Sequence, residues 1–247
     1  MAEFTIPTEQ VTLPSKGLLY PKESPLSKGE IEMKYMTAKH EDILTNANYI
    51  RQGTVLDKLL KELIVTDINY NDLLVGDKNA LLIAARILGY GKDYNVNYNG
   101  KEVTVDLTQL KDKEVNFSLF KEGTNDFPFT LPKSGNSITF KILTHGDEQR
   151  IEAETKGLQK IKPDVTSDVS TKMKYIITSI NGDREQKSIR DFVDNYLLAP
   201  DARALRQYYG QISPDIDMRY TPEDENYVGE GIDIPISLNF FWPDSGL

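Results

Sequence analysis

Cysteine is absent from the 247-residue sequence, and histidine occurs only twice. Without cysteine the chain cannot form disulfide bonds, thiolate zinc sites, iron–sulfur clusters or a cysteine nucleophile. Long apolar runs are also missing, because the longest, residues 80–85, falls far short of the roughly 20 residues that a membrane-spanning helix needs. The N-terminus has neither a basic start nor an apolar core, so we expect no signal peptide.

Positive charge is scarce as well. The chain has 29 lysines and arginines against 38 aspartates and glutamates, a net charge of −9. Phosphate binding depends on clustered basic side chains, so we do not expect a nucleic-acid-binding protein. The negative charge is concentrated near the C-terminus, where residues 211–247 hold eight acidic residues and one arginine. This acidic region should favour a partner of opposite charge.

What the sequence does contain is the pattern of an α+β protein. Residues 31–36 alternate between apolar and polar side chains, which predicts a half-buried strand. Apolar residues at helical spacing predict amphipathic helices over residues 55–64 and 79–88. An Asn-Gly pair at the centre of residues 94–107 predicts a β-hairpin. The length suffices for two domains of about 120 residues, each with its own core.

The second half of the sequence repeats features of the first half in the same order. Residues 73–81 and 197–205 are identical at five of nine positions and place Asp77 and Asp201 at equivalent sites. The other matching pairs are residues 13–17 with 131–135, 33–37 with 140–144, and 65–69 with 177–181. We interpret these matches as an internal duplication, in which each half has a β-rich opening segment, amphipathic helices and a terminal β-hairpin.

These matches predict how the chain is organised. Residues 1–12 form an N-terminal arm, residues 13–120 the first α+β half, and residues 121–130 a linker. Residues 131–247 form the second half, which carries the acidic region and an aromatic C-terminal tail. Within it, the polar residues 156–171 are expected to form a mobile loop.

Several segments, taken in order along the chain, resemble a known family. They are Leu13-Pro14 with Gly17-Leu18-Leu19-Tyr20, Thr37 with Glu41-Asp42-Ile43-Leu44, residues 55–60, residues 72–82, and Ile234-Pro235-Ile236 with Asn239-Phe240-Phe241-Trp242-Pro243. In this order they resemble the baseplate hub and baseplate assembly proteins of T-even-type contractile-tailed phages. The similarity runs with gaps from residue 13 to residue 243 and is most specific around Asp77 and in the tail.

The resemblance implies a non-enzymatic structural protein of the virion. Such a late protein is made in the host cytoplasm and built into the contractile tail, where it contacts other baseplate or tail proteins. An alternative within the family is a baseplate hub assembly factor, or chaperone, that is absent from the mature particle. In either role we expect no nucleic acid, no membrane insertion and no small-molecule substrate.

The resemblance also bears on metal binding. Proteins of this family often carry a CxxC pair for a zinc ribbon in their terminal hairpins, but the corresponding stretches here, residues 95–100 and 220–224, have no cysteine. We therefore expect neither a metal nor another cofactor. The hairpins should depend on cross-strand packing instead.

The candidate residues for partner binding lie near the C-terminus. They are Phe240, Phe241, Trp242 and Pro243 in the tail, and Glu223, Asp224 and Glu225 in the acidic region. Three successive aromatic side chains cannot all face one side of a strand, so the tail either plugs the protein's own core or anchors a neighbouring subunit. The acidic cluster is either a solvated hairpin tip or a surface that binds a divalent cation or attracts a basic partner.

An enzymatic hypothesis rests on His145, Asp147 and Glu148. Imidazole and carboxylate groups could together hold a catalytic metal, which would make the chain a metal-dependent hydrolase. No second histidine lies nearby, and the sequence contains no P-loop, dinucleotide-binding or nucleophile-elbow motif. We therefore expect no catalytic residues and treat this hypothesis as the weaker alternative.

Overall fold

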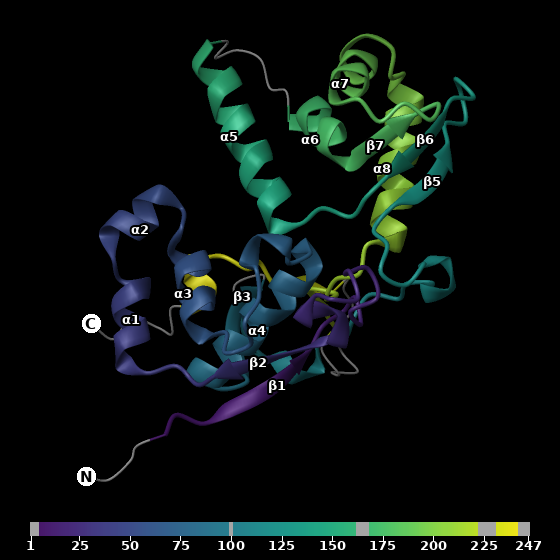
Figure 1. Cartoon of the computed structure of the whole chain (residues 1–247). Coiled ribbons are helices and arrows are strands. Elements are labelled where there is room, and N and C mark those ends of the chain that lie inside the picture. The colour runs from purple at the N-terminus through teal and green to yellow at the C-terminus, as the bar shows by residue number, and fades with distance from the viewer. Residues whose placement is uncertain (1–4, 99–100, 162–167, 222–230, 242–247) are drawn as a thin grey trace.

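The computed structural model describes residues 5–98, 101–161, 168–221 and 231–241. Helices and small antiparallel sheets succeed one another along this part of the chain (Figure 1), which confirms the predicted α+β class. One hydrophobic core cluster contains buried side chains from both predicted halves. Among the described residues, no helix combines the length and the hydrophobicity that crossing a membrane requires.

The N-terminal arm and the first half form two antiparallel strand pairs around a group of helices. Their elements are β1 (Thr8–Thr12), β2 (Glu30–Lys34), α1 (Ala38–Leu44), α2 (Ala47–Gln52), α3 (Val55–Leu63), α4 (Val75–Tyr90), β3 (Asp93–Tyr98) and β4 (Lys101–Asp106), with short 3-10 helices at Pro25–Lys28, Tyr70–Asp72, Leu107–Gln109 and Phe117–Leu119. β1 pairs with β2, and β3 pairs with β4 as the hairpin pattern predicts. Ile31 and Met33 of β2 are both buried, because alternate residues of a strand share one face.

The second half is built around a three-stranded antiparallel sheet in the order β5-β6-β7. Its elements are β5 (Phe127–Thr130), β6 (Ser137–Phe140), α5 (His145–Ile161), α6 (Asp168–Ile176), β7 (Ile177–Ile180), α7 (Gln186–Asn195), α8 (Ala199–Ile212), β8 (Arg219–Tyr220) and β9 (Ile232–Asp233), with a 3-10 helix at Leu238–Phe241. β8 pairs with β9, at the position of the expected second hairpin.

Two details of the predicted organisation differ from the structure. Residues 127–130, expected to close the linker, form β5 because they pair with β6. Residues 156–161 and 168–171, expected in a mobile loop, are helical. α5 continues through its polar sequence to Ile161, since polar residues with good helix propensity suit an exposed helix. Polarity alone therefore did not distinguish a loop from a solvent-facing helix.

Each half contains a loop between two antiparallel strands that a helical aspartate holds in place. In the first half, Asp77 of α4 accepts hydrogen bonds from the Ser15 backbone N–H at 2.9 Å and the Ser15 hydroxyl at 2.6 Å. In the second half, Asp201 of α8 accepts hydrogen bonds from the backbone N–H groups of Lys133 at 2.7 Å and Ser134 at 3.0 Å. The matched sequence segments thus occupy corresponding places, while the duplication itself stays a prediction.

The two halves are joined by backbone contacts at the starts of two helices. Leu74, just before α4, forms an antiparallel bridge with Thr144, just before α5. The Val75 N–H donates to the Leu143 carbonyl at 3.1 Å, and the His145 N–H donates to the Leu73 carbonyl at 2.7 Å. These bonds place the first turns of α4 and α5 side by side.

Candidate functional site

A cleft of about 1070 Å³ lies between α5 of the second half and α2 and α3 of the first half. Figure 1 shows α5 extending away from the helices of the first half, with α6 of the second half beside it. The lining includes the apolar side chains Val55, Leu56, Leu82, Leu143, Ile151, Ile236 and Leu238 and the charged side chains Asp57, Lys78, Lys113, Glu148, Glu152, Lys172 and Asp215. The cleft therefore combines apolar surface with charges of both signs.

Three helices begin at this cleft. α3 begins at Val55, α4 at Val75 and α5 at His145, and residues from the first turn of each helix line it. The bridge between the segments before α4 and α5 aligns these two helix starts. Lys78 of α4 and Glu148 of α5 consequently face each other across the boundary between the halves.

A network of five side chains connects these helix starts. The Lys78 ammonium lies 2.6 Å from a Glu148 carboxylate oxygen and 3.2 Å from Nδ1 of His145. Nε2 of His145 lies 3.4 Å from Oδ2 of Asp57. The hydroxyl of Tyr70 donates a hydrogen bond to Oδ1 of Asp57 at 3.0 Å, and its ring packs edge-on against the imidazole of His145.

The chemistry of Lys78 determines which nitrogen of His145 carries the proton. An ammonium group has three donors and no acceptor, so Nδ1 of a neutral His145 must accept from Lys78 and Nε2 must hold the proton. That proton faces Asp57, although Nε2 makes no hydrogen bond that meets normal geometry within the described residues. The His145 side chain is only 4% exposed, so it is a fixed part of the boundary between the halves.

The carboxylate and phenol of the network have shifted pKa values. Burial raises the pKa of Glu148, but its contacts with His145 and the Lys78 ammonium outweigh it, and the pKa falls below its usual range. Burial together with the charge of Asp57 and the hydrogen bond to it raises the pKa of Tyr70 well above its usual range. Glu148 therefore stays ionised and Tyr70 stays a hydrogen-bond donor at neutral pH.

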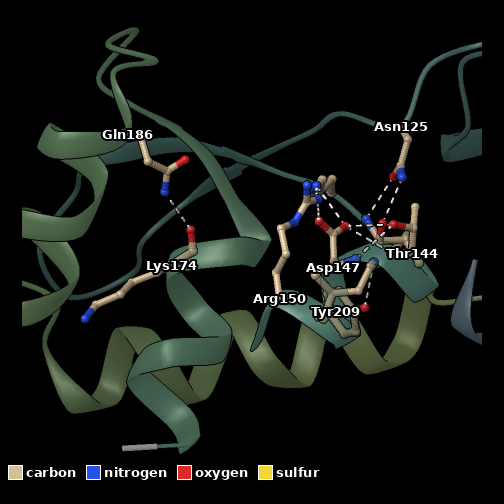
Figure 2. Close-up of polar contacts among 10 residues, drawn as sticks. Asn125, Thr144, Asp147, Arg150, Lys174, Gln186 and Tyr209 are labelled. Carbon is tan, nitrogen blue, oxygen red and sulfur yellow. Dashed lines mark hydrogen bonds and ion pairs between the residues drawn. The ribbon is translucent and has the colours of Figure 1, made fainter. Parts of the chain in front are cut away.

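Asp147 belongs to a separate group of contacts, which Figure 2 shows. Its carboxylate lies 2.8 Å from the Lys141 ammonium and 2.6 Å from the Arg150 guanidinium. The carboxylate also accepts the Thr144 backbone N–H at 3.1 Å, which caps the start of α5. Burial raises the pKa of Asp147, but these donors outweigh it and lower the pKa below its usual range.

The structure does not bring the three residues of the metal hypothesis together. His145 and Glu148 face Lys78, whose ammonium takes the place between them that a metal ion would need. Asp147 instead faces Lys141 and Arg150. In the part of the chain that the structure describes, no group of three metal-ligating side chains is found.

The predicted partner-binding residues of the tail that the structure describes lie in the core. Phe240 and Phe241 are fully buried, and the ring of Phe240 packs against Tyr94 at 5.0 Å between centroids. Nε of Arg86, on α4, donates to the Phe240 carbonyl at 3.0 Å. Phe240 and Phe241 therefore agree with the first alternative for the tail, an internal plug, and their rings are not available to a partner in this conformation.

The remaining candidates of the acidic region and tail fall outside the described residues. They are Glu223, Asp224, Glu225, Trp242 and Pro243. Conversely, no pattern in the sequence predicted Asp57, Lys78 or Tyr70 as site residues. Lys78 and Glu148 are 70 positions apart in the sequence, so only the tertiary fold reveals that they meet.

Comparison of the sequence with protein-family models, with curated proteins and with solved structures gives no match. The similarity to baseplate hub proteins therefore stays a prediction from ordered motifs. The geometry itself shows a cleft lined by apolar side chains and ion pairs, a combination typical of surfaces that bind protein segments.

Proposed function

We propose that this chain is a structural component of the tail baseplate of a contractile-tailed phage and acts through protein–protein contacts. The ordered motifs from residue 13 to residue 243 support the baseplate assignment. The cleft between the halves is the observation that supports a binding role most directly. We propose that a short segment of another baseplate or tail protein binds in this cleft.

The lining of the cleft supports a protein segment as occupant. Leu56 of α3 and Ile151 of α5 are only partly buried, and both line the cleft, so an apolar side chain inserted there would remove them from water. Lys78 and Glu148 form an ion pair and Asp57 accepts a hydrogen bond from Tyr70, so the apolar insertion leaves none of these three charges without a partner. Asp215 of the acidic region also lines the cleft, where it is paired with Lys113 at 3.5 Å.

The baseplate assignment can be tested by quantitative mass spectrometry of purified phage particles and of the soluble lysate. We expect the chain in the particle at a fixed small-integer ratio to other tail proteins. Its presence in the lysate alone would replace the structural role by that of an assembly factor. Its absence from both, in an infection that yields contractile tails, would overturn the assignment.

The role of the cleft can be tested with two variants of α5. Ile151→Glu places a charge in the cleft, whereas Ala153→Glu places the same charge on an exposed position of α5 outside the lining. We expect Ile151→Glu to weaken recovery of baseplate proteins with the tagged chain by about tenfold or more, with Ala153→Glu behaving as the wild type. Equal recovery with both variants would locate the partner site elsewhere.

A further inference from the structure

The backbone contact between the halves involves two short segments. The pre-α4 segment, residues 73–75, offers the Leu73 carbonyl and the Val75 N–H. The pre-α5 segment, residues 143–145, offers the Leu143 carbonyl and the His145 N–H, which complete two antiparallel hydrogen bonds. Leu73 and Leu74 are 0% and 2% exposed in this contact, so the segments bury apolar side chains as well as satisfy backbone groups.

Figure 2 shows how the pre-α5 segment is held in place. The side-chain amide of Asn125 both accepts from the Ile142 N–H and donates to the Ile142 carbonyl, each at 2.8 Å. The hydroxyl of Tyr209 accepts the Leu143 N–H at 3.1 Å. The segment therefore presents its remaining backbone groups in a fixed direction, toward the pre-α4 segment.

The second half contains a counterpart of the pre-α4 segment that has no such partner. The pre-α8 segment, residues 197–199, precedes α8 as residues 73–75 precede α4, and Asp201 and Asp77 occupy the same third position of the helix that follows. Leu198 is 45% exposed and its neighbour Tyr196 is 64% exposed. Within the described residues, neither the Leu197 carbonyl nor the Ala199 N–H has a hydrogen-bond partner.

The first half likewise contains a counterpart of the pre-α5 segment. The pre-α1 segment, residues 36–38, follows strand β2 as residues 143–145 follow β6. In both, the N–H of a threonine is accepted by the side chain three residues later, Nδ1 of His40 for Thr37 and the Asp147 carboxylate for Thr144. In the described part of the chain, the Met36 carbonyl and the Ala38 N–H have no hydrogen-bond partner.

We propose that copies of this chain associate head to tail, with the pre-α8 segment of one copy bound to the pre-α1 segment of another. The Ala199 N–H donates to the Met36 carbonyl of the other copy, whose Ala38 N–H donates to the Leu197 carbonyl. These bonds repeat between copies the pair that joins the two halves of one chain. The contact also removes Tyr196 and Leu198 from water.

The charges beside the two segments agree with this association. Within the chain, Lys78 of α4 and Glu148 of α5 form an ion pair next to the two backbone bonds. Beside the pre-α8 segment, α8 presents the exposed Arg203. Beside the pre-α1 segment, the exposed Lys39, Glu41 and Asp42 of α1 together carry a net negative charge. Opposite charges thus meet again when the segments of two copies pair.

The positions of the two segments determine what kind of assembly forms. Helices α1 and α7, which adjoin the pre-α1 and pre-α8 segments, lie at opposite ends of the molecule in Figure 1. One chain can therefore use both segments at once, each with a different neighbour. Such a contact joins two different surfaces and is therefore heterologous. It produces a closed ring when the rotation from each copy to the next adds up to a full turn, and an open filament when it does not. This inference goes beyond the proposed baseplate role and does not depend on it.

The test is the size of the purified full-length chain, measured by sedimentation velocity over a wide concentration series. We expect species larger than a monomer to grow with concentration. Ala199→Pro removes only the donating N–H, because proline suits the first position of a helix, and it should abolish the larger species. A wild-type chain that stays monomeric throughout, or an Ala199→Pro variant that associates like the wild type, overturns the proposal.

A complementary pair of variants identifies the contact as head to tail. Ala38→Pro removes the donor of the pre-α1 segment at the first position of α1. Each variant alone should be monomeric, while their equimolar mixture should give a dimer and nothing larger, since one intact segment remains on each. A mixture that stays monomeric contradicts the pairing.

A second substitution keeps the proposal testable if Ala199→Pro fails to fold, which circular dichroism will show. Leu198→Asp adds a charge to the exposed pre-α8 segment, and Leu119→Asp adds one at a position of similar exposure, 47%, in the 3-10 helix Phe117–Leu119. We expect loss of the larger species with Leu198→Asp alone. Association that survives Leu198→Asp, or is lost equally with Leu119→Asp, contradicts the assignment of the segment.

Discussion

Asp77 and Asp201 occupy the same position in the two halves and have opposite electrostatic character. Burial raises the pKa of Asp77 to about 6, although Ser15 and Tyr20 donate hydrogen bonds to it. Burial also raises the pKa of Asp201, but the backbone N–H groups of Lys133 and Ser134 outweigh that effect and lower the pKa below its usual range. The same residue in the same role is therefore penalised as an anion in one half and favoured in the other.

The neighbouring residues show why the two positions differ. Gly76 packs so closely against the second half that a Cβ placed on it would lie 1.9 Å from the Pro214 carbonyl oxygen. Its counterpart, Pro200, is exposed. The start of α4 is thus covered by the other half of the chain, whereas Ala199 and Pro200 at the start of α8 face solvent. Contact with the other half at the start of α4 buries Asp77, which raises its pKa, and it also covers surface there. The equivalent surface at the start of α8 stays exposed.

The largest expected effect comes from filling the close contact in the first half. Gly76→Ala forces the backbone of α4 and the Pro214 segment apart, and overpacking of this kind should lower the free energy of unfolding by about 3 kcal/mol or more. Pro200→Ala, at the equivalent exposed position, should change it by less than about 1 kcal/mol. Urea unfolding of both variants measures the difference. Equal effects would show that the two helix starts are not covered differently.

The pH dependence of stability is the next largest effect. The native pKa of Asp77 is about 6 against an ordinary value of 3.8, so between these values the native state binds more protons than the unfolded state. Stability from this group is therefore present at acidic pH and lost as pH rises through about 6, by on the order of 3 kcal/mol in total. Asp201, with its lowered pKa, acts in the opposite direction and loses stability as pH falls below its ordinary value.

These opposite signs can be separated by removing each carboxylate in turn. Urea unfolding from pH 4 to pH 7 should show that the stability of wild type relative to Asp77→Asn decreases as pH rises. The stability of wild type relative to Asp201→Asn should stay level over the same range and fall only at more acidic pH. Parallel pH profiles for the two variants would contradict the assigned pKa directions.

At neutral pH the two asparagine variants should differ by a smaller amount. An asparagine NH2 at position 201 would face a backbone N–H, which cannot accept a hydrogen bond, so Asp201→Asn should cost about 2 kcal/mol. At position 77 two of the three donors are hydroxyls, which can rotate to accept, so Asp77→Asn should stay within about 1 kcal/mol of the wild type. Thermal and urea unfolding at pH 7 compare them, and a larger loss for Asp77→Asn would reverse the ranking.

Local patterns in the sequence predicted much of the fold. The stripe over residues 55–64 corresponds to α3, and the Asn-Gly pair lies between β3 and β4. The pairing of a loop with a helical aspartate could be predicted at Asp77 and Asp201, because the loop and the start of the helix are both encoded in short segments that match between the halves. The class of fold and the places of these aspartates could be predicted because propensity and periodicity act over a few residues.

The candidate site could not be predicted in the same way. The network of Lys78, His145 and Glu148 depends on a backbone bridge between Leu74 and Thr144, and no local pattern encodes that bridge. Aromatic content predicted that the tail is either an internal plug or an anchor for a neighbouring subunit. Phe240 and Phe241 are buried, in contact with Arg86 and Tyr94 of the first half. Side-chain type indicates apolar burial but not whether the burial is within a chain or between chains.

The smallest expected effect extends the comparison to a glycine that faces open space. Gly157 lies inside α5, and a Cβ added there would meet no atom within 4 Å, in contrast to Gly76. Gly157→Ala should therefore raise the free energy of unfolding by about 0.5–1 kcal/mol, since alanine loses less backbone entropy than glycine in a helix. Gly210→Ala in α8 is the matched variant, because that position is equally open. Thermal unfolding measures both, and destabilisation at position 157 alone would mean that the outer part of α5 is covered by a neighbour, as a second copy or a bound partner would do.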